Sequence, residues 1–258
     1  MKIFLYNDET VSRFWNDRFL YHIKSIFSYK LTSNPLEEEV ETGDFFIGRF
    51  NEKKLWLKEC YKEINDKFDE RIWPEKNLID FYDDKQAQTN LFKEKKYPIP
   101  NTIVAYKKED VNLPFPLVYK KFNGSSSKNV KLVFNDDLEY PCILQEYVPT
   151  NKDLRLICIN GEVLGFERLA KEGDFRASGS GIIRKLKVLP MECVELVKRI
   201  NKENDFSCMC YDFVKSDKWY LLEMSYTFNP DVVNKYCGVM PQDLVWKGIL
   251  QKCLKYQI

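Results

Sequence analysis

The dipeptide Asn160-Gly161 constrains the fold of this chain more than any other short segment. It separates two apolar runs, 154–159 and 162–168, and Asn-Gly between such runs favours a two-residue type I′ turn. Closing this turn pairs Ile159 with Glu162. The sequence therefore predicts a β-hairpin together with its register.

Charged side chains gather at one end of this predicted hairpin. Its register sets Asp153 opposite Arg168 and Arg155 opposite Phe166, with the three charged groups on one face. Such a set is either a structural ion-pair cluster or part of a ligand site. The hairpin by itself does not decide between the two.

The order of the predicted elements indicates an α+β protein built from lobes. Residues 1–80 alternate strands and helices, which is typical of a small α/β lobe, with elements at 1–6, 11–29, 45–47 and 52–68. Asp83-Asp84 is placed to cap a helix over 85–96. Beyond Pro100 we predict strands at 102–106, 117–121, 130–134, 143–147, 154–159 and 162–168, and helices over 190–202 and 241–254.

Composition disfavours several classes of protein. Forty basic and thirty-nine acidic residues leave a net charge of +1, without a charge block of the kind that binds nucleic acid. The apolar stretches fall far short of the ~20 residues that cross a bilayer. A single histidine, His22, and no nucleophile motif argue against Ser-His-Asp and Cys-His hydrolases. The eight cysteines lack Cys-x-x-Cys spacing, which indicates free thiols and a cytoplasmic protein.

Two acidic residues interrupt a second predicted hairpin near the C-terminus. Asp212 and Glu223 lie in two apolar runs that a short polar break joins. A hairpin closed symmetrically about Ser216-Asp217 sets Asp212 opposite Leu221 and Glu223 opposite Cys210. The two carboxylates are then diagonal neighbours, roughly 7–8 Å apart at the backbone. They are either solvated acids or ligands that share a hard cation such as Mg²⁺.

Two polar loops have the composition of anion sites. The loop that contains Ser125 and Ser126 is rich in Gly and Ser, and its backbone N–H groups and hydroxyls suit a phosphate. Lys120 ends the strand before it, either reaching solvent or directing its ammonium at that phosphate. Downstream, Arg176 precedes small residues that include Ser178, and an arginine beside such backbone suits a phosphoryl group.

The order of these segments resembles the ATP-grasp superfamily, most closely its ribosomal-protein glutamate ligase (RimK-type) branch. The resemblance covers about residues 80–235, and its most specific parts are the strings Gln145-Glu-Tyr-Val148 and Ala170-Lys-Glu-Gly-Asp-Phe-Arg176. It implies an α+β ATP-grasp fold with ATP between its last two lobes. The lobes expected are a small N-terminal α/β lobe (1–80), a central lid lobe with its preceding helix (81–148) and a C-terminal lobe (149–258).

The resemblance also implies roles for individual residues. Contacts to ATP are implied for Lys85, Lys120, Ser125, Ser126, Gln145, Glu146, Tyr147, Val148, Asp153, Arg176 and Ser178. Catalytic roles at the phosphates and the substrate carboxylate are implied for Lys120, Arg168 and Arg176. Mg²⁺ would be held by Asp212, Glu223 and Ser225, although the family has asparagine at the last of these positions and Asn229 is a second candidate.

The activity implied is ligation of a carboxylate to an amine through an acyl phosphate made from ATP. Positioning and charge neutralisation supply most of such catalysis. The substrates would be small molecules or peptides, and self-association is common in the family. The segments 175–181 and 223–228 resemble ATP-grasp proteins of bacterial surface-polysaccharide synthesis, which favours a sugar acid.

Two alternatives to a ligase stay open. A kinase of the same fold would need a basic acceptor pocket, for which the N-terminal lobe offers Arg13, Arg18 and Arg49. A nucleotide-binding protein without catalysis is favoured by Ser225, whereas Asp212 argues against it.

Overall fold

The chain divides by its internal contacts into two compact units. The computed structural model describes residues 1–7, 13–48, 59–82, 84–122 and 129–255. The first unit comprises Met1–Ile79 and Asn229–Ile258, and the second comprises Asp80–Phe228. The expected C-terminal lobe over 149–258 thus differs from the observed division, because its last two helices group with the N-terminal segment. The helix that ends the chain packs against the first helix of the same unit.

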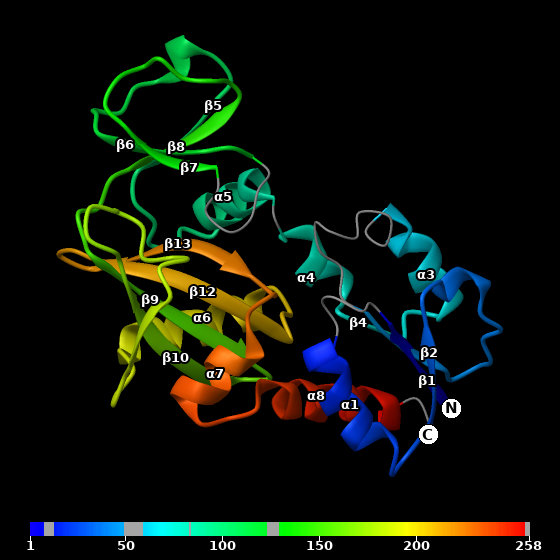
Figure 1. Cartoon of the computed structure of the whole chain (residues 1–258). Coiled ribbons are helices and arrows are strands. Elements are labelled where there is room, and N and C mark those ends of the chain that lie inside the picture. Colours follow the sequence, from blue (N-terminus) through cyan, green and yellow to red (C-terminus); the bar gives the residue numbers. More distant parts are fainter. Residues whose placement is uncertain (8–12, 49–58, 83, 123–128, 256–258) are drawn as a thin grey trace. The chain divides into compact units, whose positions relative to one another are not determined.

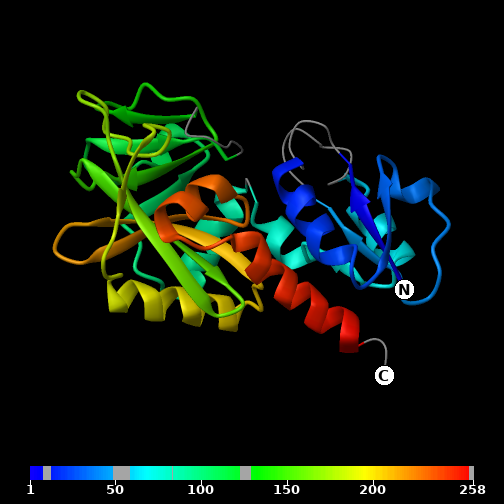
Figure 2. The same cartoon turned by 60° about the horizontal axis from the view of Figure 1, so that its bottom comes forward.

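The first unit is built on a parallel sheet of order β2-β1-β3-β4. Its strands are β1 (Lys2–Tyr6), β2 (Ser28–Thr32), β3 (Phe45–Ile47) and β4 (Ile72–Trp73). Its helical segments are α1 (Arg13–Ile23), η1 (Pro35–Glu37), α3 (Tyr61–Lys67), α4 (Lys76–Asp80, whose last residue begins the second unit), α7 (Pro230–Cys237) and α8 (Pro241–Lys255). Figure 2 shows α8, in red, running beside α1, in blue.

The second unit contains two antiparallel sheets (Figure 1). The lid sheet has the order β5-β8-β6-β7, from β5 (Thr102–Ala105), β6 (Leu117–Lys120), β7 (Val130–Val133) and β8 (Cys142–Glu146). The large sheet has the order β11-β10-β9-β12-β13, from β9 (Lys152–Ile159), β10 (Glu162–Leu169), β11 (Ile182–Lys185), β12 (Cys208–Lys215) and β13 (Trp219–Ser225).

Three helical segments complete the second unit: α5 (Lys85–Glu94), η3 (Lys108–Asp110) and α6 (Met191–Glu203). α6 packs on β9 and β12, burying Val194, Val197 and Ile200 as its apolar spacing predicts, while Leu196 is only half-buried. The Asp84 side chain caps α5 by accepting a hydrogen bond from the Ala87 N–H at 2.8 Å. The cap is therefore confirmed for Asp84, whereas Asp83 lies outside the described residues.

The Asn160-Gly161 hairpin has the predicted register. Ile159 pairs with Glu162, Arg155 with Phe166 and Asp153 with Arg168. Both turn residues have positive φ, 48° and 85°, as a type I′ turn requires. Turn chemistry alone thus determines the register of β9 and β10.

The second hairpin has a different register from the one predicted. Asp212 pairs directly with Glu223, and Cys210 pairs with Ser225. The loop contains three residues instead of two, since Lys215 pairs with Trp219, and the strands shift once more at a β-bulge beside Asp212. Leu222 is the extra residue, and its carbonyl accepts a hydrogen bond from Lys120 Nζ at 3.4 Å. The neighbouring Leu221 N–H donates to the Pro98 carbonyl at 2.7 Å. Bonds from outside the hairpin therefore stabilise the bulge, which makes the two carboxylates direct neighbours.

Several short elements differ from the sequence prediction. The predicted helix over 11–29 ends at Ile23, and β2 follows it, whereas residues 52–58 of the predicted helix over 52–68 lie outside the described ranges. β4, α4, β11 and α7 carried no clear pattern and were not predicted. None of the eight cysteines, all of which lie in the described part of the chain, forms a disulfide, and six of them are buried. Among the described residues, no helix combines the length and apolar character needed to cross a bilayer.

Candidate functional site

A cleft of about 730 Å³, including its open mouth, lies in the second unit between the lid sheet and the large sheet. Apolar side chains line it from both sheets: Val118 and Val130 from the lid sheet, and Val214 and Leu222 from the large sheet. The polar residues that line it are Lys120, Gln145, Glu146, Tyr147, Thr150, Lys152, Asp153, Arg176, Ser178, Asp212 and Glu223.

Four charged side chains on β9, β10 and β12 form an arginine–aspartate network beneath this cleft: Asp153, Arg155, Arg168 and Asp212. Arg155 donates from Nε to Asp212 Oδ1 and from Nη2 to Oδ2, both at 2.7 Å. Arg168 binds both oxygens of Asp153, also at 2.7 Å, and its Nη2 lies 2.7 Å from Asp212 Oδ2. The sequence left open whether the three charged groups of the β9–β10 hairpin form an ion-pair cluster or part of a ligand site. The bidentate pairs show that they belong to an ion-pair cluster, and this cluster borders the cleft.

Burial and charge act in opposite directions on the two aspartates of the network. Burial raises the pKa of Asp212, but Arg155 and Arg168 outweigh it and hold that pKa well below the ordinary range. For Asp153, burial raises the pKa more than the bonds from Arg168 lower it. Asp212 is therefore the member whose negative charge the network stabilises most strongly.

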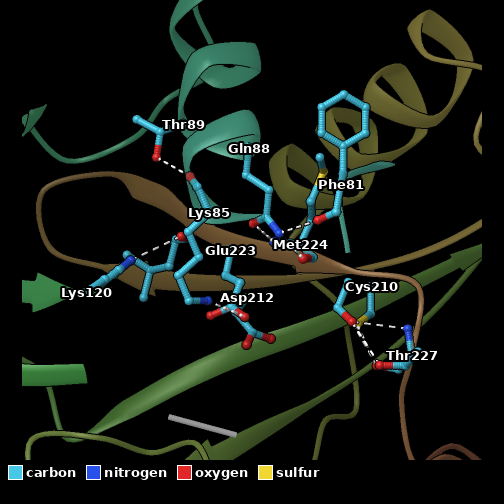
Figure 3. Close-up of polar contacts among 12 residues, drawn as sticks. Phe81, Lys85, Gln88, Thr89, Lys120, Cys210, Asp212, Glu223, Met224 and Thr227 are labelled. Carbon is cyan, nitrogen blue, oxygen red and sulfur yellow. Dashed lines mark hydrogen bonds and ion pairs between the residues drawn. The ribbon is translucent and has the colours of Figure 1, made fainter. Parts of the chain in front are cut away.

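The helix α5 presents a lysine to the other carboxylate of the hairpin (Figure 3). Lys85, in its first turn, places Nζ 3.0 Å from Glu223 Oε1. Burial raises the pKa of Glu223, but the charges of Lys85 and Lys120 and the hydrogen bond from Lys85 together outweigh it, so the net shift of this pKa is downward. Gln88, one turn on, holds the helix to β13: its side-chain amide donates to the Met224 carbonyl at 2.9 Å and accepts from the Met224 N–H at 3.1 Å.

Lys120, at the end of β6, is a buried cation bound to neutral groups. Only 8% of the residue is exposed. Its ammonium donates to Gln145 Oε1 at 2.8 Å and to the Leu222 carbonyl at 3.4 Å. No carboxylate among the described residues lies within ion-pair distance of it. Burial, followed by repulsion from Lys85, lowers the pKa of Lys120 to about 8.

The mouth of the cleft is lined by the predicted loop after β10. Arg176 donates to both oxygens of Asp174 at 3.0 Å, so its guanidinium is held close to its own loop. Phe175 lies edge-on to Tyr147, with 6.2 Å between ring centroids. Glu146 Oε2 accepts from the Asn101 side chain at 2.7 Å, and the Glu146 N–H donates to the Asn101 carbonyl at 2.8 Å. These bonds order the apolar and aromatic wall at 146–148.

Asp212 and Glu223 offer oxygens of the kind that Mg²⁺ prefers, and they face one cleft as paired residues of β12 and β13. These two carboxylates therefore fit a divalent ion bound together with a phosphate. Ser225 fits less well, because its Oγ donates to the Thr227 carbonyl at 3.2 Å and accepts from the Thr227 N–H at 3.1 Å. The side chain of Asn229 caps α7 in the first unit by accepting from the Asp231 N–H.

Most residues singled out from the sequence line this one cleft, and the exceptions differ in kind. Lys85 lines a smaller adjoining cavity that shares Lys120, Gln145 and Glu223 with the cleft. Arg168 lies beneath the cleft in the network, and Ser225 lines neither cavity. Ser125 and Ser126 are outside the described residues.

Three residues of the site make contacts that were not predicted from the sequence. The bond from Arg155 to Asp212 depends on β12 lying beside β9, which no local pattern predicts. Gln88 has no motif, although its place one turn after Lys85 puts it on the same helix face. Lys152, which lines the cleft and pairs with Glu167 at 3.1 Å, gave no signal beyond its charge.

Comparison with solved structures relates this fold to known ATP-grasp proteins. D-alanine–D-alanine ligase from Bacillus anthracis matches with a TM-score of 0.72 and 14% identity, covering 99% of both chains. The macrocyclase MdnC from Microcystis aeruginosa, bound with precursor peptide MdnA, matches at 0.71 and 12%, covering 97% of this chain and 100% of its own. A RimK domain ATP-grasp protein from Sphaerobacter thermophilus matches at 0.70 and 12%, covering 95% and 98%. These likenesses confirm the predicted α+β ATP-grasp fold.

The sequence agrees with the fold. No match to the chain was found among curated proteins. The family described as RimK-like ATP-grasp domain matches residues 82–239, more than half of the chain and close to the extent of the resemblance seen in the sequence. The chain therefore belongs to the RimK-like ATP-grasp family of ligases.

Proposed function

We propose that this protein joins a carboxylate to an amine at the expense of ATP, with Mg²⁺, through an acyl phosphate. The observation that supports this best is the charge arrangement of one cleft. The buried ammonium of Lys120 has only neutral acceptors, and the paired carboxylates of Asp212 and Glu223 line the same cleft. A phosphate would give Lys120 the anionic partner that it lacks, and the two carboxylates would hold a divalent ion that neutralises phosphate charge.

The cleft offers separate places for the parts of ATP. The wall at 146–148 would take the adenine, with its backbone groups for the base edge and apolar side chains above and below. Lys120 would contact the inner phosphates, and Arg176 with Ser178 would contact the terminal phosphate. Lys85 contacts Glu223, which lines the cleft, and would place a second ammonium near the phosphates. Asp153 would lie near the ribose while its carboxylate stays bound to Arg168.

The chemistry requires little covalent work from the protein. A substrate carboxylate oxygen attacks the γ-phosphorus, and ADP leaves. The amine nitrogen then attacks the acyl carbon, phosphate leaves with the C–O bonding pair, and the amine loses a proton. Bound Mg²⁺ supplies neutralisation of the phosphate charge. Lys120 and Arg176 neutralise the remaining charge and hold the phosphates in line, and the apolar walls of the cleft exclude water from the acyl phosphate.

Calorimetry with Mg-ATP, followed by hydroxylamine trapping, tests this proposal. We expect one ATP to bind per chain, and ADP release to require a carboxylate. Hydroxylamine should convert the acyl phosphate to a hydroxamate, which identifies the carboxylate in a screen. Sugar acids come first in that screen because of the resemblance of 175–181 and 223–228 to polysaccharide-associated proteins, followed by amino acids and peptides. Absence of ATP binding would refute the proposal.

The same screen separates a ligase from a kinase. A phosphorylated product without any hydroxamate would identify a kinase. That alternative needs free basic groups in the N-terminal segment, and Arg18 is already held by both oxygens of Asp243 at 2.6 and 2.7 Å. The Arg13 side chain and Arg49 lie outside the described residues. No observation therefore favours the kinase over the ligase.

A further inference from the structure

Two arginines occupy most of the hydrogen-bond acceptor positions of the Asp212 carboxylate. An ionised carboxylate has two oxygens with about four acceptor positions in all. Oδ2 accepts from Arg155 Nη2 and lies 2.7 Å from Arg168 Nη2, and Oδ1 accepts from Arg155 Nε. One acceptor position therefore remains, on Oδ1. An oxygen that bridges two metal ions needs both of its acceptor positions, so Asp212 in this arrangement suits one ion at most.

Glu223 provides the second anionic donor, and no third one joins it among the residues that the structure describes. Its Oε1 contacts Lys85, its side chain is 37% exposed and it lines the cleft, so it can offer an oxygen to an ion there. Within the described ranges, no group of three or more His, Cys, Asp or Glu side chains is placed to hold a metal. The hydroxyl of Ser225 is used by the turn to Thr227. The donor set thus consists of one oxygen each from Asp212 and Glu223.

The charge balance of the site leads to the same conclusion. The arginine–aspartate network and the neighbouring lysines together contain four cations, Arg155, Arg168, Lys85 and Lys120, and three anions, Asp153, Asp212 and Glu223. This set of groups is therefore slightly positive before nucleotide or metal binds. A second divalent ion would face Arg155 across the carboxylate that both would share, and like charges at such short distance repel strongly.

We propose that Arg155 acts as a built-in cation that takes the place of a second metal ion, so that the site binds a single divalent ion with the nucleotide. This inference rests on the proposed function, because it concerns the metal of the same nucleotide site. Arg155 is a positioning residue in this scheme: it fixes Asp212, leaves one oxygen position for the ion and supplies the charge that another ion would bring. Arg155 and Ser225 then both favour a site for one ion: Arg155 supplies positive charge, and the Ser225 hydroxyl is bound to Thr227.

The test counts Mn²⁺ bound to the protein with the non-hydrolysable analogue AMPPNP, by electron paramagnetic resonance of the free ion and by calorimetry. We expect one Mn²⁺ per bound nucleotide in the natural protein. Arg155→Met should raise the count toward two, because it frees two acceptor positions of Asp212. Ser225→Asn alone should leave the count at one, whereas the double variant Arg155→Met/Ser225→Asn should reach two at lower Mn²⁺ concentration. Arg184→Met, which removes an arginine paired with Glu167 away from the cleft, is the matched control and should keep one ion.

Several outcomes would overturn the inference, and they differ from failure of the proposed function. Two Mn²⁺ ions in the natural protein, with nucleotide bound, would refute the one-ion site alone. A count of two in Ser225→Asn alone would show that residue 225, rather than Arg155, limits the site. This variant does not touch the buried network, so it remains decisive if Arg155→Met does not fold. Failure of the natural protein to bind nucleotide at all would instead remove the proposed function and the inference with it.

Discussion

The two sides of the cleft neutralise charge in different ways. On the arginine–aspartate side, both carboxylates are bound by guanidinium groups through pairs of bonds at 2.7 Å. On the opposite side, Lys85 makes a single contact to Glu223, and the ammonium of Lys120 rests on an amide and a carbonyl oxygen. Both sides are largely buried, so the difference is one of geometry and pairing.

This difference indicates a division of labour within the site. A bidentate arginine pair has fixed geometry and no spare charge, which suits a rigid framework that positions Asp212. A buried ammonium with neutral partners gains much more from an arriving anion. We therefore expect substitutions on the arginine side to affect folding, and substitutions on the lysine side to affect ligand binding. The predictions below test this contrast.

The largest effect is expected from Asp212→Asn. The substitution leaves Arg155, whose side chain is 22% exposed, without its anionic partner and weakens one contact of the buried Arg168. Removing one member of a buried ion pair typically costs about 3 to 5 kcal/mol of folding free energy. Urea unfolding measures that loss, and ADP release should fall to background in parallel.

The control for this variant lies in another buried ion pair of the same sheet. Glu167→Gln disturbs the contacts with Lys152 and Arg184, both of which are partly exposed, and should cost clearly less than Asp212→Asn. Equal costs would contradict the special role given to the network. Normal turnover by Asp212→Asn would remove Asp212 from the metal site.

A smaller loss of stability is expected from Gly165→Ala on β10. A Cβ added there would lie 2.5 Å from Leu156 Cδ2 and 3.0 Å from the Arg155 carbonyl oxygen. Leu156 can yield, but the backbone of β9 cannot move without shifting Arg155. Overpacking of this kind costs about 1 to 3 kcal/mol, which urea unfolding measures. A change below about 0.5 kcal/mol, within the range of ordinary surface substitutions, would show that the arginine side is less rigid than we infer.

Lys120→Met should separate binding from stability. It removes a buried charge but leaves Gln145 Oε1 without its donor, so the two effects on folding oppose each other. We expect unfolding to change by no more than about 1 kcal/mol, and the Kd for Mg-ATP to rise about 10- to 100-fold, as loss of a bond to a charged group predicts. Calorimetry and urea unfolding supply both numbers. Lys187→Met, at an exposed lysine, is the control and should alter neither.

The two hairpins show how much of the fold could be predicted from the sequence. The register of β9 and β10 follows from Asn160-Gly161, because the turn residues determine it locally. The register of β12 and β13 does not, because the loop closes with Lys215 opposite Trp219 and the bulge at Leu222 depends on bonds to Lys120 and Pro98, which are far away in sequence. A rule based on the loop alone therefore missed the direct pairing of Asp212 with Glu223.

The sequence predicted which residues belong to the candidate site, but it did not predict all of the contacts between them. Family resemblance identified Lys120, Arg176, Asp212 and Glu223, all of which line one cleft. It did not reveal that Arg155 binds Asp212, since this contact requires β12 to lie next to β9 in a specific register. Strand neighbours that are distant in sequence are set by packing of the whole unit, and such packing has no short motif.

The smallest effect, and the most specific test of the lysine side, concerns pH. Because the pKa of Lys120 is lowered to about 8, the unfolded chain binds more protons than the folded one between about pH 8 and its ordinary value near 10.4. This group therefore makes the free protein more stable as pH rises through that window. ATP binding should show the opposite trend, because only the charged ammonium pairs with phosphate. At pH 8 about half of the molecules carry that charge, so binding should take up about half a proton per ATP. Calorimetry in two buffers of different ionisation enthalpy measures this uptake, which should vanish in Lys120→Met. An uptake that persists in the variant would assign the proton to another group and leave the two sides of the cleft alike in their response to nucleotide.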